Sequence, residues 1–186
     1  MALAASILAA PGFGAQIPRK TPEFVFQLPD GQQQLLSTYK GKTIVLAFMY
    51  TTCPHCQKTA KLLSQIQKEY EGKGVQVLGA VFDQGATARA VEFDKTLGLN
   101  FPVGVCDKAG VCDTRTVLGF LQQPVNDPYF VPILVFIDKR GMIRSQYIGD
   151  ETFLSKQEVN IRAEIDKLLK GATTTSSTET HKAPKS

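Results

Sequence analysis

The stretch "TIVLAFMYTTCPHC", residues 43–56, joins an apolar run to two cysteines that are separated by two residues. From Thr43 to Tyr50 nearly every residue is apolar or β-prone, which is typical of a central strand buried on both faces. After the cysteines, apolar residues recur at helical spacing, at Leu62, Leu63, Ile66 and Tyr70. Cys53 and Cys56 therefore fall between a buried strand and a helix, at the sheet edge where reacting groups gather in open α/β proteins.

The two cysteines are expected to play different roles in thiol–disulfide exchange. Cys53 lies at the helix N-terminus, where unpaired N–H groups and the helix dipole favour the thiolate, so it is the expected nucleophile. Cys56, one turn further in, is placed to attack a mixed disulfide on Cys53 and release the substrate. Pro54 suits the first helical turn, and His55 is expected to stabilise the neighbouring thiolate, which would make the disulfide a stronger oxidant.

The rest of the chain alternates between strand and helix patterns. Strands are expected over residues 75–82, 103–105, 132–138 and 142–149, and helices over residues 86–97, 114–120 and 155–169. Val91 is counted among the apolar members of the helix over 86–97, and Val159 is placed on the buried side of the last helix. Residues 23–28 and 34–36 predict an N-terminal β-hairpin. This order predicts an α/β fold with a mixed central sheet and helices on both faces.

The two ends of the chain differ from its middle. Ala2–Ala10 resembles the apolar region of a secretory signal and is too short to span a bilayer, and a disordered N-terminus is the alternative. From Gly171 the chain is Thr/Ser-rich, which predicts a disordered tail. We expect one redox domain over residues 21–170, with a signal-like or disordered segment over 1–20 and a tail over 171–186. The signal predicts a periplasmic or secreted protein, anchored to the membrane only if its N-terminus is retained.

The charges give no sign of a nucleic-acid partner. The formal net charge is +4, and the lysines and arginines are scattered rather than gathered in a basic stripe. No stretch approaches the ~20 apolar residues of a membrane helix, so no stable span is expected in the mature form.

Together these features resemble the thioredoxin superfamily, specifically the TlpA/ResA-like extracytoplasmic thiol–disulfide oxidoreductases of the redoxin (AhpC/TSA) group. The residues that carry the resemblance are "PEFVFQLPDGQQQLLSTYKGKTIVLAFMYTTCPHC" (22–56) and "VPILVFIDKRGMI" (131–143). The resemblance implies a thioredoxin-like fold and a cis bond between Val131 and Pro132, in a loop that lies against the cysteines. It also implies substrate contacts at Thr52 and at the backbone of Val131. No cofactor is implied; the expected partners are protein thiols or disulfides and a membrane or soluble redox partner.

Three positions depart from these families. Thr52 stands where thioredoxins carry Trp, Ala47 replaces their buried acid, and Thr59 replaces the glutamate of ResA-like proteins. Both usual proton acceptors are therefore missing, and general-base help for the second cysteine is expected to be weak. Leu46 and Tyr50 occupy the Pro and Thr positions of the peroxiredoxin pattern, so peroxidase activity is not expected.

Cys106 and Cys112 are a second candidate pair. Their spacing permits a small structural disulfide in an oxidising compartment, which is the plain interpretation, and two free thiols are a further possibility. If the strand over 103–105 is parallel to the first buried strand, Cys106 shares a sheet edge with Cys53, and the pair could act as a redox relay. A zinc site made of all four cysteines lacks the usual spacing and would bury the nucleophile, so no metal is expected.

The sequence thus predicts an enzyme that exchanges a Cys53–Cys56 dithiol or disulfide with proteins, acting as a reductase. The Pro-His dipeptide favours a disulfide-forming oxidase or isomerase as the alternative, and a non-catalytic binding protein of the same fold is a third. Phe48, Tyr50 and Phe130 are expected to pack around the site. The loop over residues 121–129 either shapes a groove for a partner or is a plain surface loop.

Overall fold

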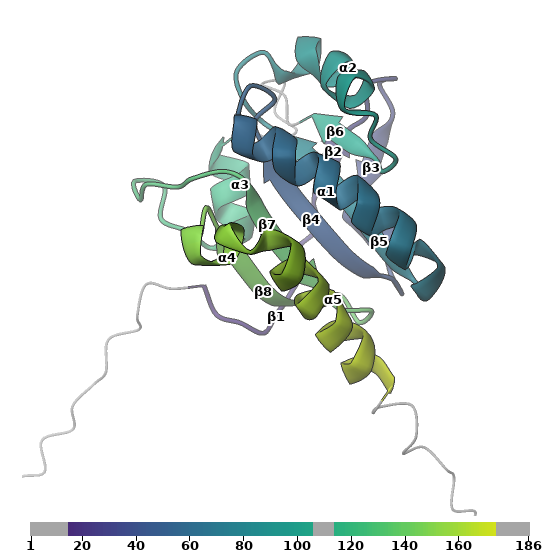
Figure 1. Cartoon of the computed structure of the whole chain (residues 1–186). Helices are drawn as coiled ribbons and strands as arrows, with labels where there is room; N and C mark the ends of the chain where they lie inside the picture. The colour runs from purple at the N-terminus through teal and green to yellow at the C-terminus, as the bar shows by residue number, and fades with distance from the viewer. Residues whose placement is uncertain (1–14, 106–113, 174–186) are drawn as a thin grey trace, which may run out of the picture.

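The structure, a computed structural model, describes residues 15–105 and 114–173. Its centre is one eight-stranded mixed sheet in the order β1-β8-β7-β4-β5-β6-β2-β3 (Figure 1). The strands are β1 (Arg19–Lys20), β2 (Val25–Gln27), β3 (Gln33–Leu35), β4 (Thr43–Met49), β5 (Val75–Val81), β6 (Val103–Val105), β7 (Ile133–Ile137) and β8 (Met142–Ile148). The central strand β4 pairs in parallel with β5 and antiparallel with β7, and all of its residues are buried. This confirms the prediction of a strand covered on both faces.

Helices cover both faces of the sheet, as predicted. On one face, α1 (Pro54–Tyr70), α2 (Ala86–Leu97) and α5 (Gln157–Thr173) pack on a core that includes alternate β4 residues, Val45, Ala47 and Met49. On the other face, α3 (Thr114–Leu121) packs on the intervening residues of β4, including Leu46 and Phe48. Figure 1 shows α1 and α5 side by side across the sheet, with α3 behind it. The two-residue period of the strand therefore supplies both cores.

The predicted N-terminal hairpin is present. β2 and β3 pair antiparallel, and β2 also pairs with β6 at the edge of the sheet. A short 3₁₀ helix over Leu36–Tyr39 follows β3 at once, so the second strand of the hairpin ends one residue earlier than expected. A Cβ atom on Gly104 would lie 2.1 Å from the Phe26 ring, so this glycine lets the hairpin close onto β6.

The predicted last helix is present as α5, and a short helix that the sequence did not predict, α4 (Glu151–Ser155), precedes it from an N-cap formed by Asp150. Two predictions about which helix residues are buried are wrong. Val159 is 67% exposed, because the buried stripe of α5 consists of Ile161, Ile165 and Leu168, and a residue two positions before Ile161 points away from it. Val91 is 55% exposed for the same reason, since its neighbours Ala90 and Phe93 form the buried side of α2.

The predictions for the chain ends fall largely outside the described residues. This holds for residues 1–14 and for residues 174–186, while α5 continues to Thr173, into the segment predicted as a tail. Within the described part of the chain, no helix is long and apolar enough to cross a membrane.

Candidate active site

Cys53 caps the N-terminus of α1. Its backbone is extended, and its sulfur accepts a hydrogen bond from the Cys56 N–H at 3.5 Å. Pro54 follows in the first helical turn, as the sequence predicts. The Cys53 sulfur faces the first turn of α1 and is half-buried, so a substrate can reach it at the helix N-terminus.

Cys56 is fully buried, one turn into α1. Its sulfur accepts a hydrogen bond from the Tyr50 N–H at 3.5 Å. Burial raises the pKa of the Cys56 thiol far above its ordinary value, and the nearby Cys53 and Asp83 raise it further, while the Tyr50 N–H opposes them. In the dithiol state Cys56 is therefore protonated at neutral pH, and it must lose a proton before it can attack a disulfide.

The loop before β7 lies against Cys53. The Val131–Pro132 bond is cis, as the resemblance implied, and the Val131 carbonyl oxygen is 4.0 Å from the Cys53 sulfur. Thr52 is exposed beside Cys53. The structure thus brings the two segments that the sequence singled out, residues 52–56 and 131–132, together at the Cys53 sulfur.

Cys53 opens into a groove of about 660 Å³. The groove is lined by Tyr50, Cys53, Asn126, Asp127, Pro128, Tyr129, Phe130 and Val131. The Tyr50 and Tyr129 hydroxyls share a hydrogen bond of 2.6 Å, which ties the loop to the end of β4. Because residues 126–129 contribute to the groove wall, the structure favours the groove-shaping interpretation of this loop over that of a plain surface loop.

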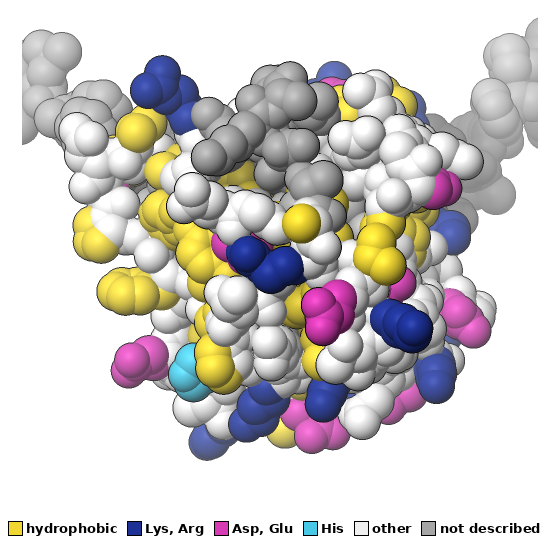
Figure 2. Space-filling model, turned by 90° about the horizontal axis from the view of Figure 1, so that it is seen from above, with side chains coloured by type: hydrophobic (Ala, Val, Ile, Leu, Met, Phe, Trp, Pro, Cys, Tyr) yellow, Lys and Arg dark blue, Asp and Glu magenta, His cyan; other side chains and the backbone are white. Residues whose placement is uncertain are grey.

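Phe130 does not pack as predicted. It is 67% exposed, whereas Phe48 is fully buried and Tyr50 is half-buried. The Phe130 backbone lies so close to Gly149 that a Cβ atom on Gly149 would be 2.9 Å from the Phe130 Cα. On the face seen in Figure 2, exposed apolar side chains (yellow) are most numerous on the left of the view. An exposed aromatic ring at the groove rim suits contact with a partner better than internal packing.

His55 is exposed, and among the described residues its side chain makes no hydrogen bond or ion pair. The contact with Cys53 that would tune the thiolate is therefore missing from this conformation.

The two positions that lack the usual acids are occupied by groups that cannot accept a proton from Cys56. Ala47 is fully buried in β4. Thr59 is also buried, and its hydroxyl donates a hydrogen bond to the Gln157 side chain at 2.7 Å. The expectation of weak general-base help thus has a structural basis.

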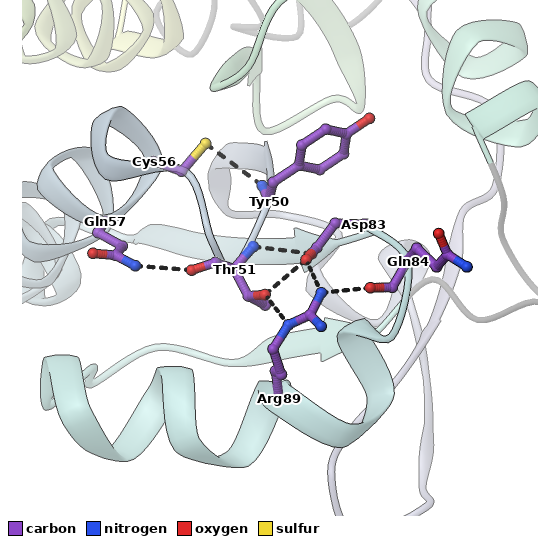
Figure 3. Close-up of polar contacts among 7 residues, drawn as sticks. All are labelled: Tyr50, Thr51, Cys56, Gln57, Asp83, Gln84 and Arg89. Atoms are coloured by element: carbon purple, nitrogen blue, oxygen red, sulfur yellow. Dashed lines mark hydrogen bonds and ion pairs between the residues drawn. The ribbon is translucent and has the colours of Figure 1, made fainter.

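Sequence reasoning missed a carboxylate close to the site, Asp83, which lies just after β5. Its oxygens accept hydrogen bonds from the N–H and the hydroxyl of Thr51, at 2.9 and 2.7 Å, and form an ion pair with Arg89 of α2 (Figure 3). Burial would raise the pKa of Asp83, but the bonds from Thr51 and Arg89 outweigh it and hold that pKa below its ordinary value. The sequence held one indication of Asp83, because it follows the predicted strand β5, whose end lies at the same sheet edge as the end of the parallel strand β4. Nothing in the sequence pointed to Arg89.

Cys106 and Cys112 lie outside the described residues. The strand that leads to them, β6, is parallel to β5 and hence to β4, which is the condition for a shared sheet edge. In the described segments, no group of three or more His, Cys, Asp or Glu side chains could hold a metal ion.

Comparisons with known proteins agree with this geometry. Residues 17–146 match the AhpC/TSA family. The chain is 31% identical over 138 residues to the thiol-disulfide oxidoreductase ResA of Bacillus thuringiensis (strain Al Hakam), covering 74% of this chain and 72% of that protein. It is 34% identical over 97 residues to ResA of Bacillus subtilis (strain 168), covering 52% of this chain and 53% of that protein.

Solved structures share the fold. A thiol:disulfide interchange protein of the thioredoxin family from Chlorobium tepidum TLS, 20% identical, superposes with a TM-score of 0.66 over 84% of this chain and 99% of that chain. A thiol:disulfide interchange protein from Bacteroides sp., 18% identical, also gives 0.66, over 91% of this chain and 99% of that chain. The thioredoxin-like fold is confirmed.

Proposed function

Since this chain belongs to the AhpC/TSA family and, within the thioredoxin superfamily, to the TlpA/ResA-like thiol–disulfide oxidoreductases, we propose that Cys53 and Cys56 are its redox couple and that it reduces protein disulfides. The observation that carries this proposal is the difference between the two sulfurs. Cys53 is accessible at a helix N-terminus and opens into a groove, whereas Cys56 is buried behind it and held as a thiol. An exposed attacker and a sheltered resolver are what a two-step exchange needs.

The proposed reaction proceeds in two steps. The Cys53 thiolate attacks a client disulfide, forming a mixed disulfide and releasing one client thiolate. Cys56, once deprotonated, then attacks the Cys53 sulfur, which forms the Cys53–Cys56 disulfide and releases the second client thiolate. The released client sulfurs take up the protons. A membrane or soluble dithiol partner must then reduce the Cys53–Cys56 disulfide.

We propose that Thr52 and the Val131 backbone contact the client next to Cys53, with Pro132 fixing the loop. The support is their position, because Thr52 is exposed and the Val131 carbonyl faces the Cys53 sulfur. Phe130 adds an apolar contact at the rim of the groove. We also propose an extracytoplasmic location, supported by the apolar Ala2–Ala10 segment.

The direction of electron flow is tested by the reduction potential of the Cys53–Cys56 pair against glutathione. A reductase should lie near the value of thioredoxin, about −270 mV, and a value near that of the strong oxidant DsbA, about −120 mV, would refute the reductase proposal. The exposed position of His55 favours the reductase, because a histidine that does not contact the thiolate stabilises it little. The Pro-His dipeptide keeps the oxidase or isomerase as the competing candidate.

Catalysis itself is tested by Cys53→Ser. The variant should lose insulin reduction and also disulfide formation. If both activities stayed at the wild-type level, the protein would be a non-catalytic binding protein of thioredoxin fold.

For the second pair we propose a structural Cys106–Cys112 disulfide. Mass spectrometry of alkylated protein should show that this bond survives reduction that opens Cys53–Cys56. Opening of both pairs together would favour a relay instead.

A further inference from the structure

Every polar group of Thr51, two residues before the proposed nucleophile, forms a hydrogen bond. Its N–H and hydroxyl donate to the Asp83 carboxylate, and its carbonyl accepts from the Gln57 side chain at 2.9 Å (Figure 3). Its hydroxyl also accepts from Arg89 Nε at 2.9 Å. The turn between β4 and α1 is thus fixed to α1 on one side and to the β5–α2 connection on the other.

The anchor of this turn is a charge. The Asp83 side chain is only 8% exposed, and its pKa is held low, so it is ionised at neutral pH. The Asp83 carboxylate accepts a hydrogen bond from the Thr51 N–H. The preceding residue, Tyr50, donates its N–H to the Cys56 sulfur. The groups that face Cys56 and affect its ionisation are Cys53 at the start of α1, the Tyr50 N–H at the end of β4, and Asp83 beyond β5. A buried negative charge in this place opposes a thiolate on Cys56.

Arg89 is the counter-charge that offsets this opposition. Its side chain is 40% exposed, and its guanidinium contacts the Asp83 carboxylate, the Thr51 hydroxyl and the Gln84 carbonyl. Its position on α2 lets it reach the carboxylate from the side of the solvent. The cation therefore pairs with Asp83 and offsets part of its charge, while the hydrogen bonds from Thr51 stay in place.

We propose that Asp83 and Arg89 form a positioning pair in which Asp83 fixes the turn before Cys53 and Arg89 offsets its charge, so that buried Cys56 can deprotonate and resolve the mixed disulfide. This inference rests on the proposed function. In the step concerned, the Cys56 thiolate bonds to the Cys53 sulfur, the bond from Cys53 to the client sulfur breaks, and the proton lost by Cys56 ends on the departing client thiolate. Ala47 and Thr59 stand in the usual acid positions, so neither position supplies a carboxylate base to Cys56.

The test follows the reaction of the reduced full-length protein with 5,5′-dithiobis(2-nitrobenzoate) by stopped flow at neutral pH. The first release of nitrothiobenzoate reports attack by Cys53, and the second reports displacement by Cys56. Cys56→Ser identifies the phases, because it keeps the first and loses the second. The variants are Arg89→Gln, Asp83→Asn, the double variant, and Arg89→Lys, which keeps the charge.

Arg89→Gln should slow the second phase by about threefold for each unit by which the Cys56 pKa rises. One unit removes about nine-tenths of the thiolate, and the more basic sulfur regains roughly threefold in nucleophilicity. Asp83→Asn should leave the second phase as fast as in the wild type or faster, and the double variant should return to within about twofold of the wild type. Arg89→Lys should match the wild type.

A merely structural role predicts the opposite pattern. The double variant would then be at least as slow as Arg89→Gln, and Asp83→Asn would be slow by itself; either result overturns the proposal. If Arg89→Gln does not fold, Asp83→Asn decides alone, since only charge removal can maintain or raise its rate. Loss of the first phase in Cys53→Ser with no loss of insulin reduction would instead refute the proposed function, so the two failures are distinguishable.

Discussion

Replacing Gly149 with alanine should displace the loop that faces Cys53. A Cβ atom on Gly149 would lie 2.2 Å from the Phe130 Cβ and 2.9 Å from its Cα and carbonyl carbon. Ordinary carbon–carbon contacts are about 3.5–4.0 Å, so the two segments must separate by more than about 1 Å at the closest contact. Gly149 also donates its N–H to the Pro132 carbonyl, so the separation is passed directly to the residues beside the nucleophile. We expect insulin reduction to fall by about 10- to 100-fold, since a shift of ~1 Å can cost about 100-fold in rate.

The matched control is Gly141→Ala. Gly141 lies in the turn between β7 and β8, at the other end of β8, and shares a positive φ, +77° against +55° for Gly149. Nothing lies within 4 Å of the place that a Cβ atom on Gly141 would take, so alanine there costs only the backbone strain, about 1–2 kcal/mol. Urea unfolding should show a larger loss of stability for Gly149→Ala, by about 1–3 kcal/mol from overpacking. Equal activity in the two variants, both folded by circular dichroism, would refute the reasoning.

Three further predictions concern other parts of the molecule. Phe130→Ser should raise the KM for a protein client while leaving urea unfolding within about 0.5 kcal/mol of the wild type, because the ring is exposed at the groove rim; an unchanged KM would contradict its role. Gln67→Leu should lower the free energy of unfolding by about 1–3 kcal/mol, because the Gln67 side chain accepts a hydrogen bond of 2.7 Å from the buried Val77 N–H, which leucine cannot replace. Burial would raise the pKa of Asp138, but hydrogen bonds from the Met142 N–H and Arg144 outweigh it and hold that pKa below its ordinary value. The ionised Asp138 therefore contributes to stability above an ordinary carboxyl pKa, and this contribution is lost as pH falls through the lowered pKa. Asp138→Asn should therefore be less stable than the wild type at pH 7, and the difference should shrink in acid unfolding below about pH 3.9.

The sequence predicts the parts of this fold that depend on local pattern. The apolar run of β4 and the helix after Cys53 were predictable because burial on both faces and the change of period leave a clear record in the residues. The cis bond at Pro132 and the approach of this loop to Cys53 could be predicted only through the resemblance to a known family. The exposed positions of Val159 and Val91 were not, since an apolar residue beside the buried stripe has the same composition as one within it.

What the sequence could not supply are contacts between distant segments. Arg89 reaches Thr51 and Asp83 only because β4 and β5 are adjacent and parallel, so the pairing is a property of the sheet order and not of any local motif. Phe130 was assigned to the packing around the site because aromatic residues are usually buried. Its ring is nevertheless 67% exposed, and the close approach of its backbone to Gly149, which directly follows β8, is a contact between distant segments.

The Cys53 sulfur caps α1, and under the proposed function the same atom carries out the exchange. Any free energy by which the helix stabilises the Cys53 thiolate is equally the free energy by which that thiolate stabilises the folded helix. Resistance to unfolding and reducing power are therefore linked. A protein whose dithiol form resists unfolding more than its disulfide form holds its electrons more tightly, by about 1.4 kcal/mol for each 30 mV. A reductase must thus gain stability from the disulfide, and comparing urea unfolding of the two redox forms would place this protein on the potential scale without any electrode.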